Sequence, residues 1–232
     1  MPELPEVETV GAGLAPVTIG QIITNIIIRQ EKLRYPIPEN LPQLLHKQHI
    51  KNIERRSKYL LVTTSHGTLI IHLGMSGCLC LVDSDTTIAK HDHVDFIFKN
   101  GTCLRYNDPR RFGLILWTDQ DPHQHKLLSK LGPEPLTAAF SSKYLFTQTQ
   151  KRKIGIKQLI MDSHAVVGVG NIYANEALFK AGIHPLTICH QLELTQIQTL
   201  TKEIKKILRR AIKQGGTTLK DFKNSEGKPG YC

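Results

Sequence analysis

The sequence predicts an α+β protein in two parts: an N-terminal antiparallel β-sandwich with a leading helix, then a helical domain. Alternating apolar residues separated by turn signals fill residues 19–118. Prolines and glycines interrupt the chain at 120–135, and apolar residues then recur at three- and four-residue steps. The 232 residues therefore divide into expected domains at 1–125 and 131–232.

The leading helix is predicted over residues 5–15. Pro5 can open a helix because its missing N–H falls where no intrahelical partner exists, and acidic residues follow in the first turn. Pro16 is expected to end the helix.

The strands are predicted from β-branched residues, alternation and turns. Ser65-His66-Gly67 and Asn100-Gly101 each separate two apolar runs, which is typical of hairpins. In the second hairpin, Val94, Phe96 and Phe98 fall on one face. The predicted strands include residues 22–28, 59–64, 68–73, 94–99, 102–106 and 112–118. Two packed sheets are expected.

The second half of the chain is predicted to be helical and basic. Apolar residues from Leu192 to Ala211 form a helical stripe with basic residues between them. Residues 131–232 hold 15 basic and 7 acidic side chains, whereas residues 1–130 hold 15 and 13. This excess favours a polyanionic partner such as nucleic acid. The alternative for this helix is a solvated basic face.

Several classes of protein are disfavoured. No apolar run reaches the ~18–20 residues of a membrane span, and the acidic N-terminus is unlike a signal peptide, so we expect a cytoplasmic protein without a membrane partner. The five cysteines form no C-x-x-C pair, and His91-Asp92-His93 lacks a third ligand at a suitable spacing. No metal site is predicted.

The start of the chain, Met1-Pro2-Glu3, is a candidate catalytic site. Removal of Met1 would leave Pro2 as a secondary amine, and because α-amino groups have a pKa of about 8, a useful fraction is neutral and nucleophilic. Attack on a sugar C1′ would give an iminium ion, with Glu3 as acid or base and Glu6 one helical turn further on. The alternative is an ordinary N-terminus.

Three further segments carry candidate residues. Lys58 opens an apolar strand, where a lysine can donate a proton or bind a phosphate. The glycines around Met75 allow an exposed turn, from which Met75 can wedge into a base stack. In Asp108-Pro109-Arg110-Arg111-Phe112-Gly113, Arg can replace a base while Phe stacks. The alternatives are an edge-strand charge, a core methionine and a turn with an Asp–Arg ion pair.

The glycine-rich segment 166–176 is interpreted as a turn that runs into a helix. The N–H groups of such a helix start can bind a phosphate. Asn171 could cap the helix or donate to that phosphate, and Lys151 and Lys157 upstream add positive charge. The alternative is a helix start without a ligand.

Nine segments of the sequence, in this order, resemble bacterial formamidopyrimidine-DNA glycosylase, also called 8-oxoguanine DNA glycosylase. The match runs over essentially the whole chain. The segments are MPELPEVETV (1–10), RRSKYLL (55–61), IHLGMSG (71–77), KHDHVD (90–95), DPRRFG (108–113), LGPEPL (131–136), VVGVGNIYANEALF (166–179), AGIHP (181–185) and GGTTLKDF (215–222).

The resemblance implies a DNA-repair enzyme with a helix–two-turn–helix element in its second domain. It implies a flipped-out lesion nucleotide read between the domains, excision of oxidised purines and β-elimination at the abasic site. Its partner would be duplex DNA containing oxidised purines or abasic sites. The enzyme would be a monomer and would act at the nucleoid. The resemblance implies that Pro2 is the nucleophile, Glu3 the acid/base group and Lys58 the proton donor in strand cleavage by β-elimination. The implied wedge consists of Met75, Arg110 and Phe112. The implied DNA contacts are His91, Arg110, Lys151, Lys157 and Asn171. The loop 215–231, with Thr217, Thr218 and Tyr231, would close over the lesion.

The chain departs from the family pattern at its end. The family continues for about forty residues into a zinc finger with four cysteine ligands, so its single structural zinc would need ligands beyond residue 232. No cofactor is expected within this chain. The missing finger leaves one alternative, a DNA-binding remnant without catalysis. Within the family, a second alternative is a pyrimidine-lesion glycosylase. The Leu4-Pro5 start and the Gly-Gly-Thr-Thr loop argue against the second.

Overall fold

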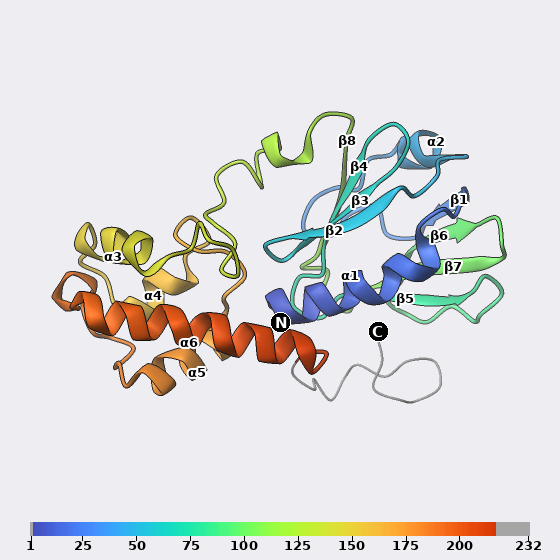
Figure 1. Ribbon diagram of the computed structural model, residues 1–232. Helices are drawn as coiled ribbons and strands as arrows, with labels where there is room; N and C mark the ends of the chain where they lie inside the picture. Colours follow the sequence, from blue (N-terminus) through green and yellow to red (C-terminus); the bar gives the residue numbers. More distant parts are fainter. Residues whose placement is uncertain (1, 217–232) are drawn as a thin grey trace. The chain divides into compact units, whose positions relative to one another are not determined.

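The computed structural model describes residues 2–216, in two compact units. Among these residues, Pro2 and Glu6–His125 form the first unit, and Glu3–Pro5 and 126–216 form the second. Figure 1 shows the elements of each. The expected fold class is confirmed: antiparallel sheets make up the first unit and helices make up the second.

The first unit contains two four-stranded antiparallel sheets. One has the order β1-β6-β7-β5 and the other β2-β3-β4-β8. Both predicted hairpins are confirmed, since β3 pairs with β4 and β6 pairs with β7. The strands are β1 (Ile23–Ile28), β2 (Asn52–Arg56), β3 (Tyr59–Thr63), β4 (Thr68–His72), β5 (Cys78–Asp83), β6 (Asp92–Phe98), β7 (Thr102–Asn107) and β8 (Leu114–Thr118), with α2 (Leu41–Leu45) and the short 3-10 helix η1 (Pro122–Gln124) in the connections.

The core of this unit lies between the sheets and beneath α1 (Leu4–Thr18). The predicted inward face of β6 is confirmed, because Val94, Phe96 and Phe98 are all buried in one apolar cluster. Val7, Val10 and Leu14 of α1 belong to the same cluster. Their spacing of three and four residues places them on one side of the helix.

The predicted end of the leading helix is wrong. α1 continues to Thr18 with Pro16 inside it. A proline in the last turn removes only one N–H donor, and the next amides still bond, with Ile19 N donating to Ala15 O at 3.0 Å. The chain leaves the helix at Gly20, whose φ of +86° suits glycine. The strand-like sequence begins at Ile19, but β1 begins at Ile23, after an isolated bridge between Ile22 and His49.

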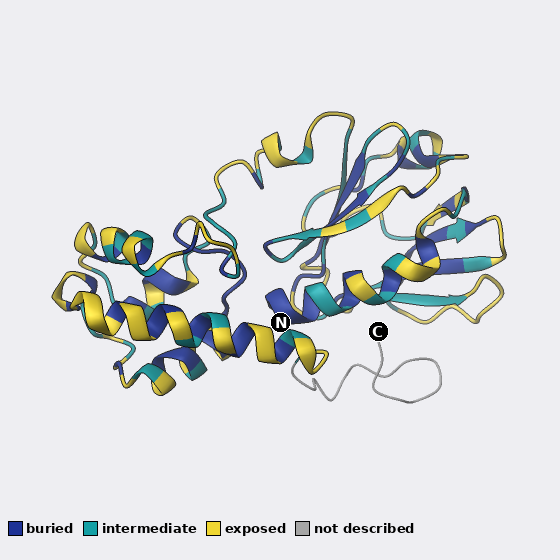
Figure 2. Ribbon diagram, in the orientation of Figure 1, coloured by how far each residue is buried: buried dark blue, intermediate teal, exposed yellow. Residues whose placement is uncertain are grey.

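The second unit is helical. Its elements are α3 (Ser142–Gln150), α4 (Ile156–Met161), α5 (Asn171–Ala181), the 3-10 turn η2 (Cys189–Gln191) and α6 (Leu194–Lys213). The predicted apolar stripe of α6 is buried from Ile197 to Ala211, and Figure 2 shows buried and exposed residues alternating along this helix. Leu192 precedes the helix but joins the same core. Within residues 2–216, no helix combines the length and apolar character needed to cross a membrane.

Candidate functional site

The buried carboxylate of Glu3 is bound to the start of α5. Its Oε2 accepts the N–H of Gly170 at 2.7 Å, and its Oε1 accepts the N–H of Ile172 at 2.9 Å. Only 2% of the Glu3 surface is exposed. Leu4 N also donates to Gly168 O at 3.1 Å. The positive end of a helix and two N–H donors form a strong binding site for an anionic side chain.

Two glycines make room for this N-terminal segment. A Cβ on Gly170 would lie 2.4 Å from Glu3 Cδ, and one on Gly168 would lie 2.6 Å from the side chain of Leu4. Gly168 also has a φ of +78°, which disfavours any other residue. Segment 168–170 is therefore shaped to receive residues 3 and 4.

This arrangement corrects one interpretation of the glycine-rich segment. The N–H groups of Gly170 and Ile172 bind a carboxylate of the chain itself, so they are not free for a phosphate. Asn171 does not cap α5 either, since Gly170 is the N-cap residue and Asn171 is the first helical residue. The sequence contained no sign that residue 3 meets residue 170.

A groove of ≈ 560 Å³ brings two predicted DNA contacts together. Lys157 from α4 and Asn171 from α5 both line it, beside Gly155, Met161 and Leu186. The backbone N–H of Lys157 donates to Pro185 O at 3.1 Å, which fixes the start of α4 against this loop. Lys151 is exposed at the end of α3 and is not among the residues that line the groove.

In the first unit, Asp108 joins the two loops that carry the predicted wedge. Its buried carboxylate accepts the hydroxyl of Ser76 at 2.8 Å and the backbone N–H groups of Gly113 at 2.9 Å and Arg110 at 3.3 Å. The alternative interpretation of this segment, a turn with an Asp–Arg ion pair, does not describe Asp108, whose carboxylate accepts a hydroxyl and two backbone N–H groups instead. The sequence interpretation did not predict these bonds to backbone N–H groups, although an Asp before Pro is a known turn former.

Glycines allow these loops to approach closely. A Cβ on Gly74, whose φ is +65°, would lie 2.5 Å from Gly113 N. Met75 and Phe112 are 40% and 47% exposed, and the Arg110 guanidinium lies 4.9 Å from the Phe112 ring centre. The three predicted wedge residues therefore project from two loops that pack together.

Lys58 lies in the tight turn between β2 and β3. Ser57 has a φ of +58°, and Arg55 stabilises the turn by donating to Ser57 O at 2.9 Å. The charge of Lys58 acts on His72 at the end of β4, directly before the loop of Met75. Tyr59, the residue after Lys58, pairs with His72 across β3 and β4, which places the base of the wedge loop near Lys58.

His72 supports the Met75 loop as a hydrogen-bond acceptor. Its Nδ1 accepts the N–H of Gly74 at 2.8 Å, which requires this nitrogen to be unprotonated. Burial, reinforced by the positive charges of Lys58 and Arg34, lowers the pKa of His72 to about 4. In the unfolded chain its pKa returns to about 6.5.

The first unit should therefore lose stability as pH falls from 6.5 to 4, because only the unfolded chain takes up this proton. The expected loss is roughly 2 kcal/mol between pH 7 and pH 5. Urea unfolding of the wild type and of His72→Asn, whose side-chain oxygen can accept the same N–H, measures it. The wild type should lose about that much more than the variant, and equal losses would show that His72 is not the group responsible.

His91 is held beside the Asp108 loop. Asp108 N donates to His91 O at 3.1 Å, and the His93 ring nitrogen Nε2 contacts Asp108 O at 2.8 Å. The rings of His91 and His93 lie 6.3 Å apart. Across the described part of the chain, no group of three or more His, Cys, Asp or Glu side chains is arranged to hold a metal ion.

The remaining predicted residues are placed as follows. Pro2 is buried and lies two residues before Leu4, the first residue of α1, and Glu6 is buried in the first turn of this helix. Thr217, Thr218 and Tyr231 lie outside the described residues.

Family models match both parts of the chain. Residues 1–115 match the formamidopyrimidine-DNA glycosylase N-terminal domain, and residues 131–223 match the H2TH domain of the same family. A formamidopyrimidine-DNA glycosylase of Shewanella halifaxensis is 53% identical over 231 residues, covering all of this chain and 85% of the relative. One from Vibrio cholerae is 54% identical with the same coverage.

Solved structures agree. Lactococcus lactis Fpg in complex with DNA containing an abasic site has a TM-score of 0.88 at 35% identity, covering 94% of this chain and 80% of that one. A point mutant of the Lactococcus lactis protein, in complex with DNA containing Fapy-dG, gives 0.89 at 36% identity, with coverage of 94% and 81%. MutM of Thermus thermophilus gives 0.86 at 31% identity, with coverage of 99% and 84%.

Proposed function

Because this chain belongs to the formamidopyrimidine-DNA glycosylase family, we propose that it excises oxidised purines from duplex DNA and cleaves the resulting abasic site. Identity over the whole chain supports a base-excision repair glycosylase. Similar folds that bind abasic-site and Fapy-dG DNA support damaged duplex DNA as the partner. The lesion class and the lyase step are the parts that need testing.

Pro2 is the proposed nucleophile. After loss of Met1, its nitrogen attacks C1′ and gives up its proton, and the glycosidic bond breaks with its electron pair on the leaving base, which takes up a proton. The C1′–O4′ bond then breaks as O4′ is protonated, and an iminium ion between the proline nitrogen and C1′ results. The iminium withdraws electrons, so a C2′ proton can leave and the C3′–O bond breaks by β-elimination. The strand is cut on the 3′ side of the lesion, and water then releases the enzyme.

Glu3 is the proposed acid/base group beside that nucleophile. The single observation that carries the proposal is the attachment of its carboxylate to the N–H groups of Gly170 and Ile172. A chain end attached through a buried carboxylate is held in a defined place, as catalysis by a terminal amine requires. The close approach of Glu3 and Leu4 to Gly170 and Gly168, which leaves no room for a Cβ, supports the same assignment.

The other residues are proposed to hold the DNA. Lys157 and Asn171 line one groove and offer a cation and an amide for phosphate oxygens. Met75, Arg110 and Phe112 project from the paired loops and suit the space that a flipped nucleotide leaves. His91 and Lys151 are proposed phosphate contacts.

Lys58→Ala should slow processing of 8-oxoguanine more than cleavage of a preformed abasic site. The proposed reason is that, besides its implied role in the elimination, its proton assists release of the lesion base, which an abasic site has already lost. Single-turnover rates on both duplexes measure this, with Lys51→Ala on the exposed surface as the control. Equal slowing on both substrates would contradict a role for Lys58 linked to the lesion.

The lesion class is tested with matched duplexes containing 8-oxoguanine, thymine glycol or no damage. Release of 8-oxoguanine followed by a nick is expected, with slower action on thymine glycol. Preference for thymine glycol would favour the pyrimidine-lesion alternative. Tight binding without base release or nicking above the Pro2→Gly background would favour a DNA-binding protein without catalysis.

A further inference from the structure

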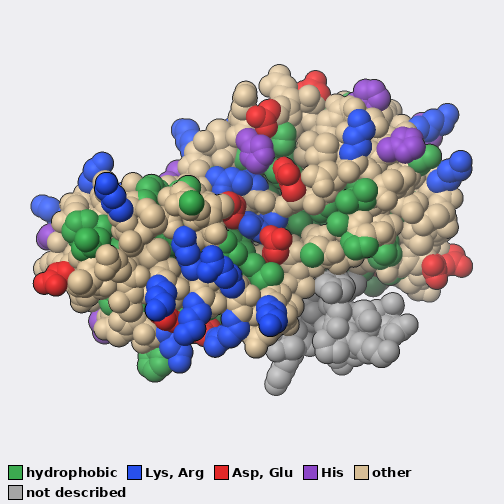
Figure 3. Space-filling model, in the orientation of Figure 1, with side chains coloured by type: hydrophobic (Ala, Val, Ile, Leu, Met, Phe, Trp, Pro, Cys, Tyr) green, Lys and Arg blue, Asp and Glu red, His purple; other side chains and the backbone are tan. Residues whose placement is uncertain are grey.

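The outer face of α6 carries a row of cations that the proposed lesion site does not use. Lys202, Lys206, Arg209 and Lys213 follow one another at steps of four, three and four residues. Because a helix turns every 3.6 residues, these four lie on one side, opposite the buried apolar stripe. We call them the α6 basic stripe. All four are exposed, and Figure 3 shows basic side chains gathered over this helix.

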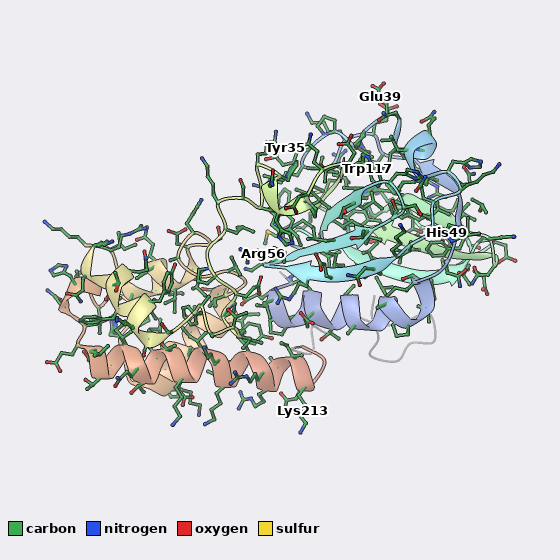
Figure 4. All side chains as sticks on the ribbon, turned by 45° about the horizontal axis from the view of Figure 1, so that its top comes forward. Tyr35, Glu39, His49, Arg56, Trp117 and Lys213 are labelled. Atoms are coloured by element: carbon green, nitrogen blue, oxygen red, sulfur yellow. The ribbon has the colours of Figure 1, made fainter. Side chains whose placement is uncertain are left out.

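The stripe has little compensating negative charge. Glu203 is the one acidic residue of α6, and it reaches Lys206 at only 3.9 Å. Among the described carboxylates, none forms an ion pair with Lys202, Arg209 or Lys213. The other two basic residues of the helix turn elsewhere, since Arg210 pairs with Glu176 and Lys205 donates to Thr137 O at 2.9 Å. Figure 4 shows Lys213 extending away from the ribbon at the end of α6.

Like charges four residues apart destabilise a helix, and here Lys202 with Lys206 and Arg209 with Lys213 form such pairs. The negative end of the helix dipole favours the positive charge of Lys213 in the last turn. Lys202 and Lys206 lie outside the last turn and gain no such stabilisation. Burial, and after it the positive charge of Arg209, lowers the pKa of Lys205. A polyanion bound along this face would relieve the repulsion.

We propose that the α6 basic stripe binds the phosphate backbone of a second DNA segment while the lesion site holds the first. From Lys202 to Lys213 the stripe covers eleven residue steps, about 16 Å at the rise of a helix. This corresponds to about five nucleotides of axial rise along a strand. The exposed large apolar side chains of the second unit do not lie among the four cations, whereas protein interfaces depend on such anchors. A protein partner is therefore disfavoured.

A second contact of this kind lets the enzyme transfer directly between DNA segments. Neutralising about four phosphates gives weak binding that falls about 10²-fold between 50 and 200 mM salt. The contact would be transient, and its effect would be kinetic. An incoming duplex binds the stripe before the first duplex has left, so departure of the first becomes faster as the concentration of the second rises.

The test uses the full chain bound to a fluorescent duplex with an uncleavable abasic analogue, challenged with undamaged duplex. We expect the dissociation rate of the fluorescent duplex to rise in proportion to the concentration of the challenging duplex. In a variant with Gln at all four stripe positions, the slope of the dissociation rate against duplex concentration should fall at least tenfold. A control with Gln at the exposed Lys32, Lys51, Lys99 and Lys126, which loses the same charge, should keep it.

Three results would overturn the proposal. The first is a wild-type dissociation rate that does not depend on the concentration of the challenging duplex. The second is an equal loss of this dependence in the control variant. The third is equal acceleration of dissociation by polyglutamate, which would show that the stripe binds any polyanion. Loss of affinity for the first duplex in the stripe variant alone would place the stripe in the primary interface and also count against it. The proposal rests on the proposed function for its first duplex, and failure of that function would appear separately, as no binding of the abasic analogue at all.

Discussion

Gly170→Ala is expected to slow release of 8-oxoguanine by about 10²-fold or more, as Glu3→Gln is. The added methyl group would lie 2.4 Å from Glu3 Cδ, so the carboxylate must leave the N–H groups of Gly170 and Ile172. The substitution displaces Glu3 without changing its chemistry. Glu3→Gln changes the chemistry and also presents an amide NH₂ to one of the two N–H donors. Single-turnover base release measures both.

Controls separate a lost acid/base group from a damaged fold. Gly182→Asn introduces a side chain at the left-handed end of α5, where nothing lies within 4 Å of the new Cβ, and base release should stay near the wild-type rate. Capture of a preformed abasic site should survive in both Glu3→Gln and Gly170→Ala, because the base is already gone. Full glycosylase turnover in Gly170→Ala would show that the position of the Glu3 carboxylate does not matter.

Retention of Met1 is expected to abolish the covalent adduct with abasic DNA. The nitrogen of Pro2 is then part of a peptide bond, and its electron pair is delocalised into the carbonyl group. Protein that keeps Met1, verified by mass, should give no adduct after borohydride reduction.

The matched control comes from the same preparation. Treatment with methionine aminopeptidase should restore the adduct in proportion to the fraction of chains that begin at Pro2. Pro2→Gly, which leaves a primary amine, tests whether the secondary amine itself is needed. An adduct of equal yield before and after removal of Met1 would be incompatible with a terminal nucleophile.

Local chemistry made much of the fold predictable. Asn100-Gly101 and Ser65-His66-Gly67 specify tight turns, so both hairpins followed from a few residues. The 3.6-residue period of α6 identified its buried face because one continuous core receives it. The predicted helix end at Pro16 was wrong because the effect of a proline depends on the turn of the helix in which it lies.

The site was predictable only in part. The resemblance identified Glu3 and segment 166–176 separately, yet their contact joins residues 167 positions apart. Periodicity and turn rules do not report contacts at such separations. Asp108 and His72 escaped for a similar reason, since their importance lies in backbone N–H groups that they bind in folded loops.

The most direct test of the account is the position of the covalent bond to DNA. Borohydride-reduced complex with an abasic duplex is digested with trypsin, and the modified peptide is sequenced by mass spectrometry. We predict the modification on the first residue of the peptide that runs from Pro2 to Arg29. A modification on a lysine side chain, such as that of Lys58, with Pro2 unmodified would contradict the account.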